Sequence, residues 1–517
     1  MKNIFGMRLV FSLLMLLTAG ATVKEACAVN HLAPAGTIGV NKFDLFTQYT
    51  GTASRGDGGP AYRRVTRAMA KKALDDAKDA GVKYMRVSMS GRTSSQPGDG
   101  RDSLDLWRSD PETFWAQVDD MIDDLDVREI QIVPVLAWSS GKFPLWAGET
   151  TGEMFRNPES RSWRLLSRFV TEFVTRYRKR PTVLFYELSN ELNNYVDLDL
   201  MRRCKKKSVC DEGDRFTADD LIAYTRRFAG LIRSLDNTRL ISSGFSIPRG
   251  SAEHLRARPE WTTRTTDWRP DTREQFAKNL KEIHAGVDII SIHLYGGKQN
   301  WRFGSNDAVD LLVEAKRVAD EVGKPLFVGE FGDPNSTALG DRSHAVRMMN
   351  KIVELRIPYS AIWVWEFYQK STYSTHDNRH NAFSLEPGYT DPLIDRLRKI
   401  NGESVKEVAP PRVVLTWPLA CAQLMKTTTV YAVASDDQAV DRVEFWLDEV
   451  MLKRDDTPPY QTDLVLSGVV PGSYRLTAKA YDRTGKMSSY STPITIGGGR
   501  AKSACEMGEF KSGNKKK

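Results

Sequence analysis

The sequence predicts an α/β protein, a (β/α)8 TIM barrel followed by a small all-β sandwich. From about residue 41 to 401, short apolar runs alternate with stretches of helical periodicity, which is typical of repeated strand-helix units around a parallel sheet. There are eight such units, the number that closes a barrel. Beyond residue 402 the helical periodicity ends, and alternating apolar and polar residues replace it, as in a β-sandwich.

The strand candidates of the barrel are eight apolar runs. They lie at residues 43–48, 83–89, 130–138, 182–191, 239–244, 287–296, 325–332 and 359–367. Between them, apolar residues recur three and four positions apart, which is typical of amphipathic helices. Eight units over about 360 residues suit a closed barrel better than an open doubly wound sheet. No glycine fingerprint for a phosphate follows the first candidate strand, which also speaks against a dinucleotide-binding fold.

The C-terminal part divides into a linker, a sandwich and a tail. Residues 402–410 have the composition of a linker, residues 411–497 carry the alternating strands, and residues 498–517 form a basic tail. The stretches VEFWLDEV, DDTPPYQTDL and GSYRLTAKAYDRTGK resemble bacterial immunoglobulin-like modules found beside secreted carbohydrate enzymes. The resemblance implies an immunoglobulin-like sandwich, and such modules are more often spacers than glycan binders.

The N-terminus has the features of a secretory signal. Lys2 and Arg8 precede the apolar run LVFSLLMLLTAGATV, and the residues ACA at 26–28 fit the small-residue cleavage pattern. We therefore expect residues 1–28 to be a signal peptide. The apolar run is too short to span a bilayer comfortably. The mature chain is expected to have no transmembrane segment and to be secreted or periplasmic.

Cleavage at this point leaves four cysteines, Cys204, Cys210, Cys421 and Cys505. An even number of cysteines in an exported protein suggests disulfides. Proximity in the sequence favours Cys204 with Cys210 and Cys421 with Cys505, although four cysteines allow three pairings. The second bridge would tie together the two ends of the sandwich.

The net charge of +8 does not indicate a nucleic-acid partner. The first 28 residues contribute +2 and the last seven contribute +4, which leaves +2 for residues 29–510. A nearly neutral body lacks the basic surface that binding to a polyanion requires.

Two carboxylates at strand ends indicate the chemistry. In a barrel of this class the functional residues gather at the C-terminal ends of the strands. The fourth candidate strand ends in Asn190 and Glu191, and the seventh ends in Glu330. Glycosidic bond cleavage needs two carboxyl groups that face one another, one to protonate the leaving oxygen and one to attack the anomeric carbon or activate water.

The two motifs resemble those of a known group. FYELSNELNN and PLFVGEFG match the strand-four and strand-seven motifs of clan A of the glycoside hydrolases, and within it the cellulase-like family 5, over about residues 41–401. The resemblance implies a retaining enzyme with Glu191 as general acid/base and Glu330 as nucleophile. An acid that is protonated near neutral pH needs a raised pKa, while a nucleophile must stay ionised. Retention requires carboxyl groups about 5–5.5 Å apart.

The resemblance also implies supporting roles for four polar residues. Arg86 matches the arginine that holds the nucleophile anionic, which suits its permanent charge. Asn190 matches the residue that bonds the sugar 2-hydroxyl group. His293 lies where the family has a histidine near the acid/base, and Tyr295 where a tyrosine donates to the nucleophile.

The aromatic residues follow the resemblance only in part. Trp365, with Trp363 as the alternative, is expected to form the stacking floor under the sugar at the eighth strand. Family 5 usually has a histidine at the end of the third strand, but this chain has Ala137 and Trp138 there. The subsite nearest the cleavage point is therefore expected to be built differently, with Trp138 among its residues.

Other candidate groups have structural interpretations. Glu187 lies deeper along the fourth strand than Glu191, so we expect it to pair with a cation inside the barrel rather than to act in catalysis. His376 and His380 have the i, i+4 spacing of metal ligands but lie in a loop without a convincing third ligand. We expect no metal and no cofactor.

The expected function is that of a secreted, endo-acting retaining β-glycosidase, cellulase- or mannanase-like, that hydrolyses a β-linked polysaccharide or oligosaccharide by double displacement. Long loops at residues 192–216 and 245–271 favour a polymeric substrate. The alternatives are a catalytically silent carbohydrate-binding scaffold and a transglycosylase that acts on exopolysaccharide. The sequence does not separate β-glucan, β-mannan and exopolysaccharide as substrates. We expect a monomer.

Overall fold

The structure confirms the predicted fold class, a barrel followed by antiparallel β-sheets. The computed structural model describes residues 36–50, 67–90, 103–138, 140–203, 211–296, 303–305, 307–333, 343–367, 383–387, 390–402, 410–418, 420–435 and 440–498. The expected signal peptide, the basic tail beyond residue 498 and the histidines at 376 and 380 lie outside these residues. Among the described residues, no helix combines the length and apolar character needed to cross a bilayer.

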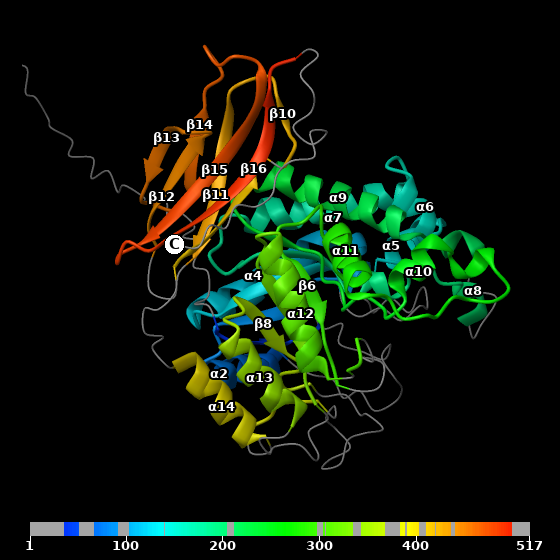
Figure 1. Cartoon of the computed structure of the whole chain (residues 1–517). Coiled ribbons are helices and arrows are strands. Elements are labelled where there is room, and N and C mark those ends of the chain that lie inside the picture. The colour runs from blue at the N-terminus through cyan, green and yellow to red at the C-terminus, as the bar shows by residue number, and fades with distance from the viewer. Residues whose placement is uncertain are drawn as a thin grey trace, which may run out of the picture.

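Eight parallel strands form the barrel (Figure 1). They are β1 Gly39–Asn41, β2 Tyr84–Ser88, β3 Gln131–Ala137, β4 Tyr186–Ser189, β5 Ile241–Ser242, β6 Ile290–His293, β7 Leu326–Phe331 and β8 Tyr359–Ile362. The strands pair in the order β5-β4-β3-β2-β1-β8-β7-β6. An isolated parallel bridge joins Ser242, the last residue of β5, to Ile289, which directly precedes β6, so the barrel is nearly closed.

A helix follows each strand along the chain. The helices are α2 Arg67–Asp79, α4 Pro111–Val127, α7 Arg161–Tyr177, α9 Ala218–Leu235, α11 Arg273–Ile283, α12 Ala308–Glu321, α13 His344–Glu354 and α14 Asp391–Gly402. Their buried residues recur at helical spacing, as Leu166, Phe169, Val170 and Phe173 do in α7. Side-chain caps start several helices, and the hydroxyl group of Ser160 accepts from the backbone of α7. Such caps satisfy amide groups that have no partner within the helix.

The prediction of a first strand at residues 43–48 is wrong. The first strand, β1, lies earlier in the sequence, and Leu45–Tyr49 forms the short helix α1. Leu45, Phe46 and Tyr49 are all buried, and their spacing places them on one side of a helical turn. A short apolar run fits a strand or a buried helical turn equally well, so periodicity alone could not separate them. The other seven strands overlap their expected ranges.

The C-terminal domain consists of two sheets that enclose a separate hydrophobic core. One sheet has the order β10-β16-β15-β12-β13 and the other β14-β11-β9. The strands are β9 Arg412–Trp417, β10 Gln423–Leu424, β11 Thr428–Ser435, β12 Val440–Leu447, β13 Val450–Asp455, β14 Tyr460–Leu464, β15 Gly472–Asp482 and β16 Met487–Ile496. Cys421 lies in the turn before β10; the other four cysteines of the chain lie outside the described residues.

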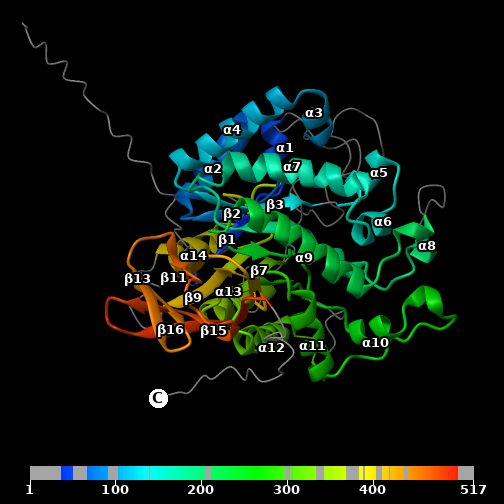
Figure 2. The ribbon, with the colours of Figure 1, turned by 90° about the horizontal axis from the view of Figure 1, so that it is seen from above.

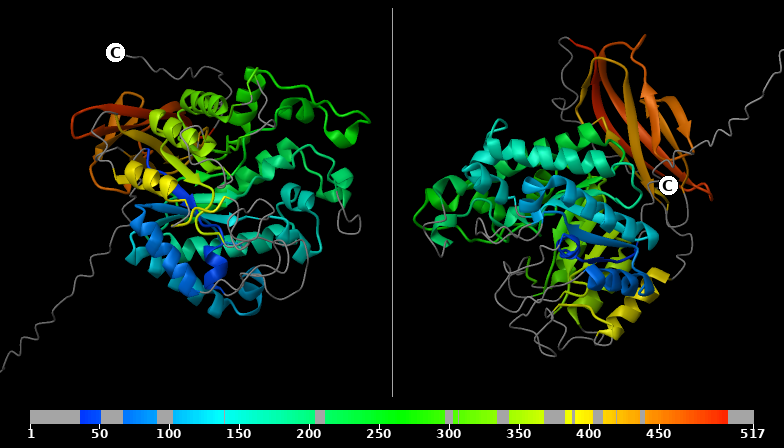
Figure 3. Two further views of the ribbon diagram at one scale, coloured as in Figure 1. Left: turned by 90° about the horizontal axis from the view of Figure 1, so that it is seen from below. Right: turned by 180° about the vertical axis from the view of Figure 1, so that it is seen from behind.

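The sandwich and the loop helices lie on different sides of the barrel. The loops after β3, β4 and β5 contain α5 Lys142–Ala147, α6 Thr151–Arg156, α8 Leu200–Arg203 and α10 Ala252–Ala257. Figures 1 and 2 show α6, α8 and α10 on one side and the orange and red strands of the sandwich on the other. Figure 3 shows the same separation from behind. The loop helices, and not the sandwich, therefore lie on the side of the C-terminal strand ends.

Candidate active site

Glu191 follows β4 in a backbone conformation that few side chains adopt. Its φ angle is +53°, in the left-handed region, and its N–H group donates to the carbonyl group of Gly244 at 2.8 Å. Gly244 also has a positive φ, and a Cβ atom there would lie 1.8 Å from the carbonyl oxygen of Ser189. Only glycine allows the ends of β4 and β5 to approach this closely. The close approach fixes the backbone of Glu191.

Glu330 lies on β7 and is almost fully buried. Its Oε1 atom accepts a hydrogen bond from Nη1 of Arg86 at 2.8 Å, and its Oε2 atom accepts one from the hydroxyl group of Tyr295 at 2.8 Å. Both carboxylate oxygens therefore have a donor, and one of these donors is a permanent cation.

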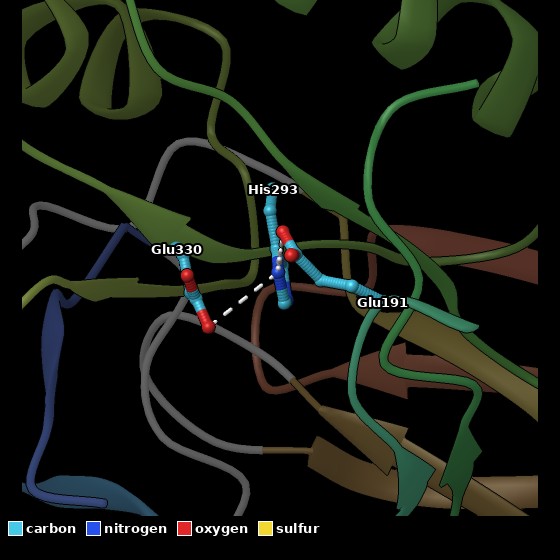
Figure 4. A group of neighbouring side chains, drawn as sticks. All are labelled: Glu191, His293 and Glu330. Carbon is cyan, nitrogen blue, oxygen red and sulfur yellow. Dashed lines mark hydrogen bonds and ion pairs between the residues drawn. The ribbon is translucent and has the colours of Figure 1, made fainter. Parts of the chain in front are cut away.

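His293, the last residue of β6, lies between the two carboxyl groups (Figure 4). Its Nδ1 atom is 2.9 Å from Oε1 of Glu191 and 3.5 Å from Oε1 of Glu330. One carboxylate oxygen of each glutamate and a ring nitrogen of the histidine all lie within 4.8 Å of one another. A Cβ atom at Gly329 would lie 2.8 Å from Nε2 of His293, so the ring packs directly against the backbone of β7.

Arg86 is fully buried on β2 and connects the residues of the site. Its Nε atom donates to Oε1 of Glu187 at 2.6 Å, and its Nη2 atom donates to Oδ1 of Asn190 at 2.8 Å. The other carboxylate oxygen of Glu187 accepts from the hydroxyl group of Ser242. Glu187 is thus the partner of a buried cation. The guanidinium group holds Asn190 and Glu330 in fixed positions because its donors form a rigid planar fork.

Asn41 was not identified from the sequence, although it completes this arrangement. Its amide nitrogen donates to the carbonyl groups of Gly329 at 2.8 Å and Ala361 at 3.0 Å, and its amide oxygen accepts from Arg86 at 3.1 Å. It therefore joins β1 to β7 and β8 next to Glu330. The available signal was a polar amide that ends the short run IGV.

Trp138 stands over the guanidinium group of Arg86. The centre of its ring is 4.8 Å from the guanidinium carbon, a cation–π geometry. Trp138, Phe43 and Trp363 have ring centroids 5.2–6.1 Å apart. These three residues form an aromatic cluster beside the site, at the position where the family resemblance led us to expect a differently built subsite.

The expected stacking floor needs a correction. Trp365 is fully buried, and its indole N–H group donates to the carbonyl oxygen of Ala73 in α2 at 2.9 Å. Its side chain therefore packs into the hydrophobic core between the barrel and its outer helices and cannot contact a sugar. Trp363, the alternative, is only partly buried and stacks on Phe43. The aromatic face at this strand end is that of Trp363.

Burial sets the protonation states around the two carboxyl groups. It raises the pKa of the Glu191 carboxyl group above its usual value, against the opposing effect of Arg86. It lowers the pKa of the His293 imidazole to about 4, so the ring is neutral at neutral pH. Burial and then the charge of Glu330 raise the pKa of the Tyr295 phenol well above its usual value. Tyr295 therefore remains a hydrogen-bond donor.

The same three side chains, Glu191, His293 and Glu330, offer ligand atoms that could surround a metal ion. However, both oxygens of Glu330 already accept hydrogen bonds, and the guanidinium group of Arg86 already supplies a positive charge beside them. The donor set therefore fits a hydrogen-bonded carboxylate better than a cation site.

Comparison with known proteins gives matches to two family models. Residues 45–369 match the model of the cellulase family, glycosyl hydrolase family 5, and residues 411–478 match the bacterial Ig domain. A search of curated proteins found no match.

Solved structures similar to this chain include two mannanases. An endo-β-1,4-mannanase from Thermotoga petrophila is 16% identical, with 90% of this chain and 98% of that chain covered at a TM-score of 0.46. An endo-1,4-β-mannanase from Rhizomucor miehei is 13% identical, with 71% and 95% covered at a TM-score of 0.48. The family model covers more than half of the chain and includes every residue of the site except Asn41 and Phe43. The chain is a glycoside hydrolase and belongs to glycosyl hydrolase family 5, with a bacterial Ig domain after its catalytic barrel.

Proposed function

We propose that this protein is an exported, endo-acting retaining β-glycosidase that cleaves a β-linked polysaccharide of the glucan or mannan type. Glu330 acts as the nucleophile and Glu191 as the general acid/base. The observation that carries the proposal is the position of the two carboxyl groups. One oxygen of Glu191, one oxygen of Glu330 and a ring nitrogen of His293 all lie within 4.8 Å of one another.

The approach of one oxygen of Glu191 and one of Glu330 to within 4.8 Å supports retention over inversion. Retaining enzymes place their carboxyl groups about 5–5.5 Å apart, whereas inverting enzymes need about 6.5–9.5 Å to admit a water molecule. Glu330 attacks the anomeric carbon while Glu191 protonates the leaving oxygen, and a glycosyl ester forms on Glu330. Glu191 then removes a proton from water, which attacks the same carbon and releases Glu330. Two inversions leave the anomeric configuration unchanged.

His293 positions the proton of Glu191. The neutral ring carries one N–H group, and its buried Nε2 atom has no hydrogen-bond partner among the described residues. A proton on Nε2 would be a buried donor without an acceptor, which costs about 1–3 kcal/mol. The proton therefore resides on Nδ1 and is donated to Oε1 of Glu191. The acid proton of Glu191 is then carried by Oε2, the oxygen that remains for the leaving group.

Asn190 and Trp363 supply the contacts to the sugar. The amide oxygen of Asn190 accepts from Arg86, which leaves its N–H groups for a sugar hydroxyl group. The partly buried ring of Trp363 offers a face for the apolar C–H surface of the sugar. The helices in the loops after β3 to β5 extend the mouth of the barrel, and this supports a polymeric substrate.

Azide rescue of two variants tests the assignment of roles. In Glu330→Ala, azide displaces an aryl leaving group directly, so a β-aryl glycoside should give the inverted α-glycosyl azide. In Glu191→Ala, azide attacks the ester on Glu330 and should give the β-glycosyl azide. Glu321→Ala, which removes an exposed carboxylate on α12, should keep wild-type activity and form no azide product. Azide products of the same configuration from both active-site variants would reject the roles.

Substrate class and export are tested separately. The purified protein is incubated with β-1,4-glucans, β-1,4-mannans and the exopolysaccharide of the producing organism, and the products are sized. Larger products from one polymer would indicate transglycosylation, and binding without any cleavage would indicate a silent scaffold. Mass spectrometry of protein from the culture medium should show a chain that begins at Val29. Non-reducing peptide maps should show the pairs Cys204–Cys210 and Cys421–Cys505.

A further inference from the structure

The N-terminal end of the barrel is closed by large apolar side chains that lie at or just before the starts of the strands. This layer includes Tyr84, Leu184, Phe185, Leu240, Ile289 and Tyr359. Leu240 is 3% exposed and Tyr359 is 2% exposed. Residues at this position in a barrel have no role at the catalytic end and act in stability.

The sandwich contributes side chains to the same apolar layer. On β11, Ala432 and Ala434 belong to the core of the sandwich, whereas Val433 between them belongs to the barrel layer. On β9, Val414 also belongs to the barrel layer, while both its sequence neighbours face the sandwich core. Successive side chains of a strand point to opposite faces of the sheet. The outer face of the β14-β11-β9 sheet is therefore packed against the barrel.

Polar and aromatic contacts extend this interface. The hydroxyl group of Thr416 on β9 donates to the carbonyl group of Asn237, just before β5, at 2.7 Å. Tyr490 on β16 packs against the same apolar layer and lies over the turn at Gly323 before β7. The contact thus spans the starts of several barrel strands.

We propose that the immunoglobulin-like domain is the floor of the catalytic barrel, a permanent part of its core, rather than a spacer or an independent glycan-binding module. Val414 is 7% exposed and Val433 is 3% exposed, although both point away from the core of their own domain. Without the sandwich, the apolar layer of the barrel and these two valines would face water, which is unfavourable in proportion to the apolar area exposed. The domain stabilises the strand starts, which hold the strand ends that carry the active site.

Hydrogen exchange of the full-length protein tests this role without reference to activity. Val433→Asp places a charge in the interface while leaving the residues of the sandwich core unchanged. Exchange at the strand starts, residues 182–186 and 239–242, should become faster by about tenfold or more. Val450→Asp is the matched control, because Val450 on β13 is 66% exposed and its replacement should leave the same segments protected.

A milder variant and a cut chain complete the test. Val433→Thr keeps the shape of the side chain but adds a hydroxyl group, and should give a smaller change in the same segments. A chain cut at a protease site inserted between residues 402 and 410 should still elute as one particle. Unchanged protection of the strand starts in Val433→Asp, or separation of the cut domains, would overturn the proposal. Loss of protection in the sandwich alone would also overturn it.

Discussion

Replacement of Arg86 by lysine keeps the positive charge but removes the fork that connects the site. The guanidinium group donates to the carboxylates of Glu187 and Glu330 and to the amide oxygens of Asn41 and Asn190. A lysine ammonium group carries its three N–H donors on one compact nitrogen atom, so it can stay close to one carboxylate but not to both. The loss of one bond to a carboxylate costs about 1.5–3 kcal/mol, and the loss of each bond to an amide oxygen costs at least about 0.5–1.5 kcal/mol. One carboxylate bond and the two amide bonds together amount to about 2.5–6 kcal/mol.

The effect on activity follows from the position of Arg86. A loss of 1.4 kcal/mol of transition-state stabilisation lowers the rate about tenfold, so kcat/KM should fall about 100-fold in Arg86→Lys. Urea unfolding measures the change in stability, and hydrolysis of an aryl glycoside measures the change in kcat/KM.

Arg239→Lys is the matched control for this prediction. Arg239 is also buried, but it lies at the other end of the barrel, where it bonds Asp236 and the backbone carbonyl groups of Val183 and Arg180. This variant should lose a similar free energy of unfolding while kcat/KM changes by no more than about twofold. The reasoning is refuted if Arg86→Lys keeps kcat/KM within that range, or if both variants lose activity equally.

Three further predictions concern aromatic residues and a buried histidine. Trp363→Ala should raise KM about fivefold to tenfold. Trp365→Phe should instead lower the free energy of unfolding by about 1–2 kcal/mol and leave KM unchanged. The reverse pattern would restore Trp365 as the stacking floor. Trp138→Leu removes the cation–π contact with Arg86, so kcat/KM should fall about fivefold to thirtyfold. In the double variant with Arg86→Lys, the loss of kcat/KM should be smaller than the two single losses combined. Full additivity would show that the contact has no role. Burial lowers the pKa of His284 to about 3, so between pH 6.5 and 3 the unfolded chain binds a proton that the folded chain does not. The contribution of His284 to the free energy of unfolding is therefore fully present above pH 6.5. It is lost as the pH falls, at about 1.4 kcal/mol per pH unit. The fall in urea stability from pH 6 to pH 4 should be smaller in His284→Asn, and an equal fall would contradict the assignment.

The sequence predicted the barrel and its two carboxylates because both depend on local patterns. Each central strand is a compact apolar run followed by a polar strand end, and the ends carrying Glu191 and Glu330 match family motifs. The helix α1 was missed because a five-residue apolar segment has no distinctive period.

The errors at the eighth strand and the missed contacts have a common physical origin. The sheet ends at Ile362, so strand alternation no longer determines where Trp363 and Trp365 point. The roles of Asn41 and Val433 depend on contacts with residues far away in the sequence. Periodicity reports which face of an element is apolar, but it does not identify the element that covers this face.

The buried ionic group around Arg86 has a consequence for the proposed chemistry. One arginine faces two carboxylates, Glu187 and Glu330, while His293 is neutral. With Glu191 in its acid form, this buried group carries an excess of one negative charge. Cleavage of a glycosidic bond creates a positive charge on the sugar ring in the transition state. The pocket therefore already contains the counter-ion for that charge, held in place before the substrate arrives, so little reorganisation is needed at the moment of reaction.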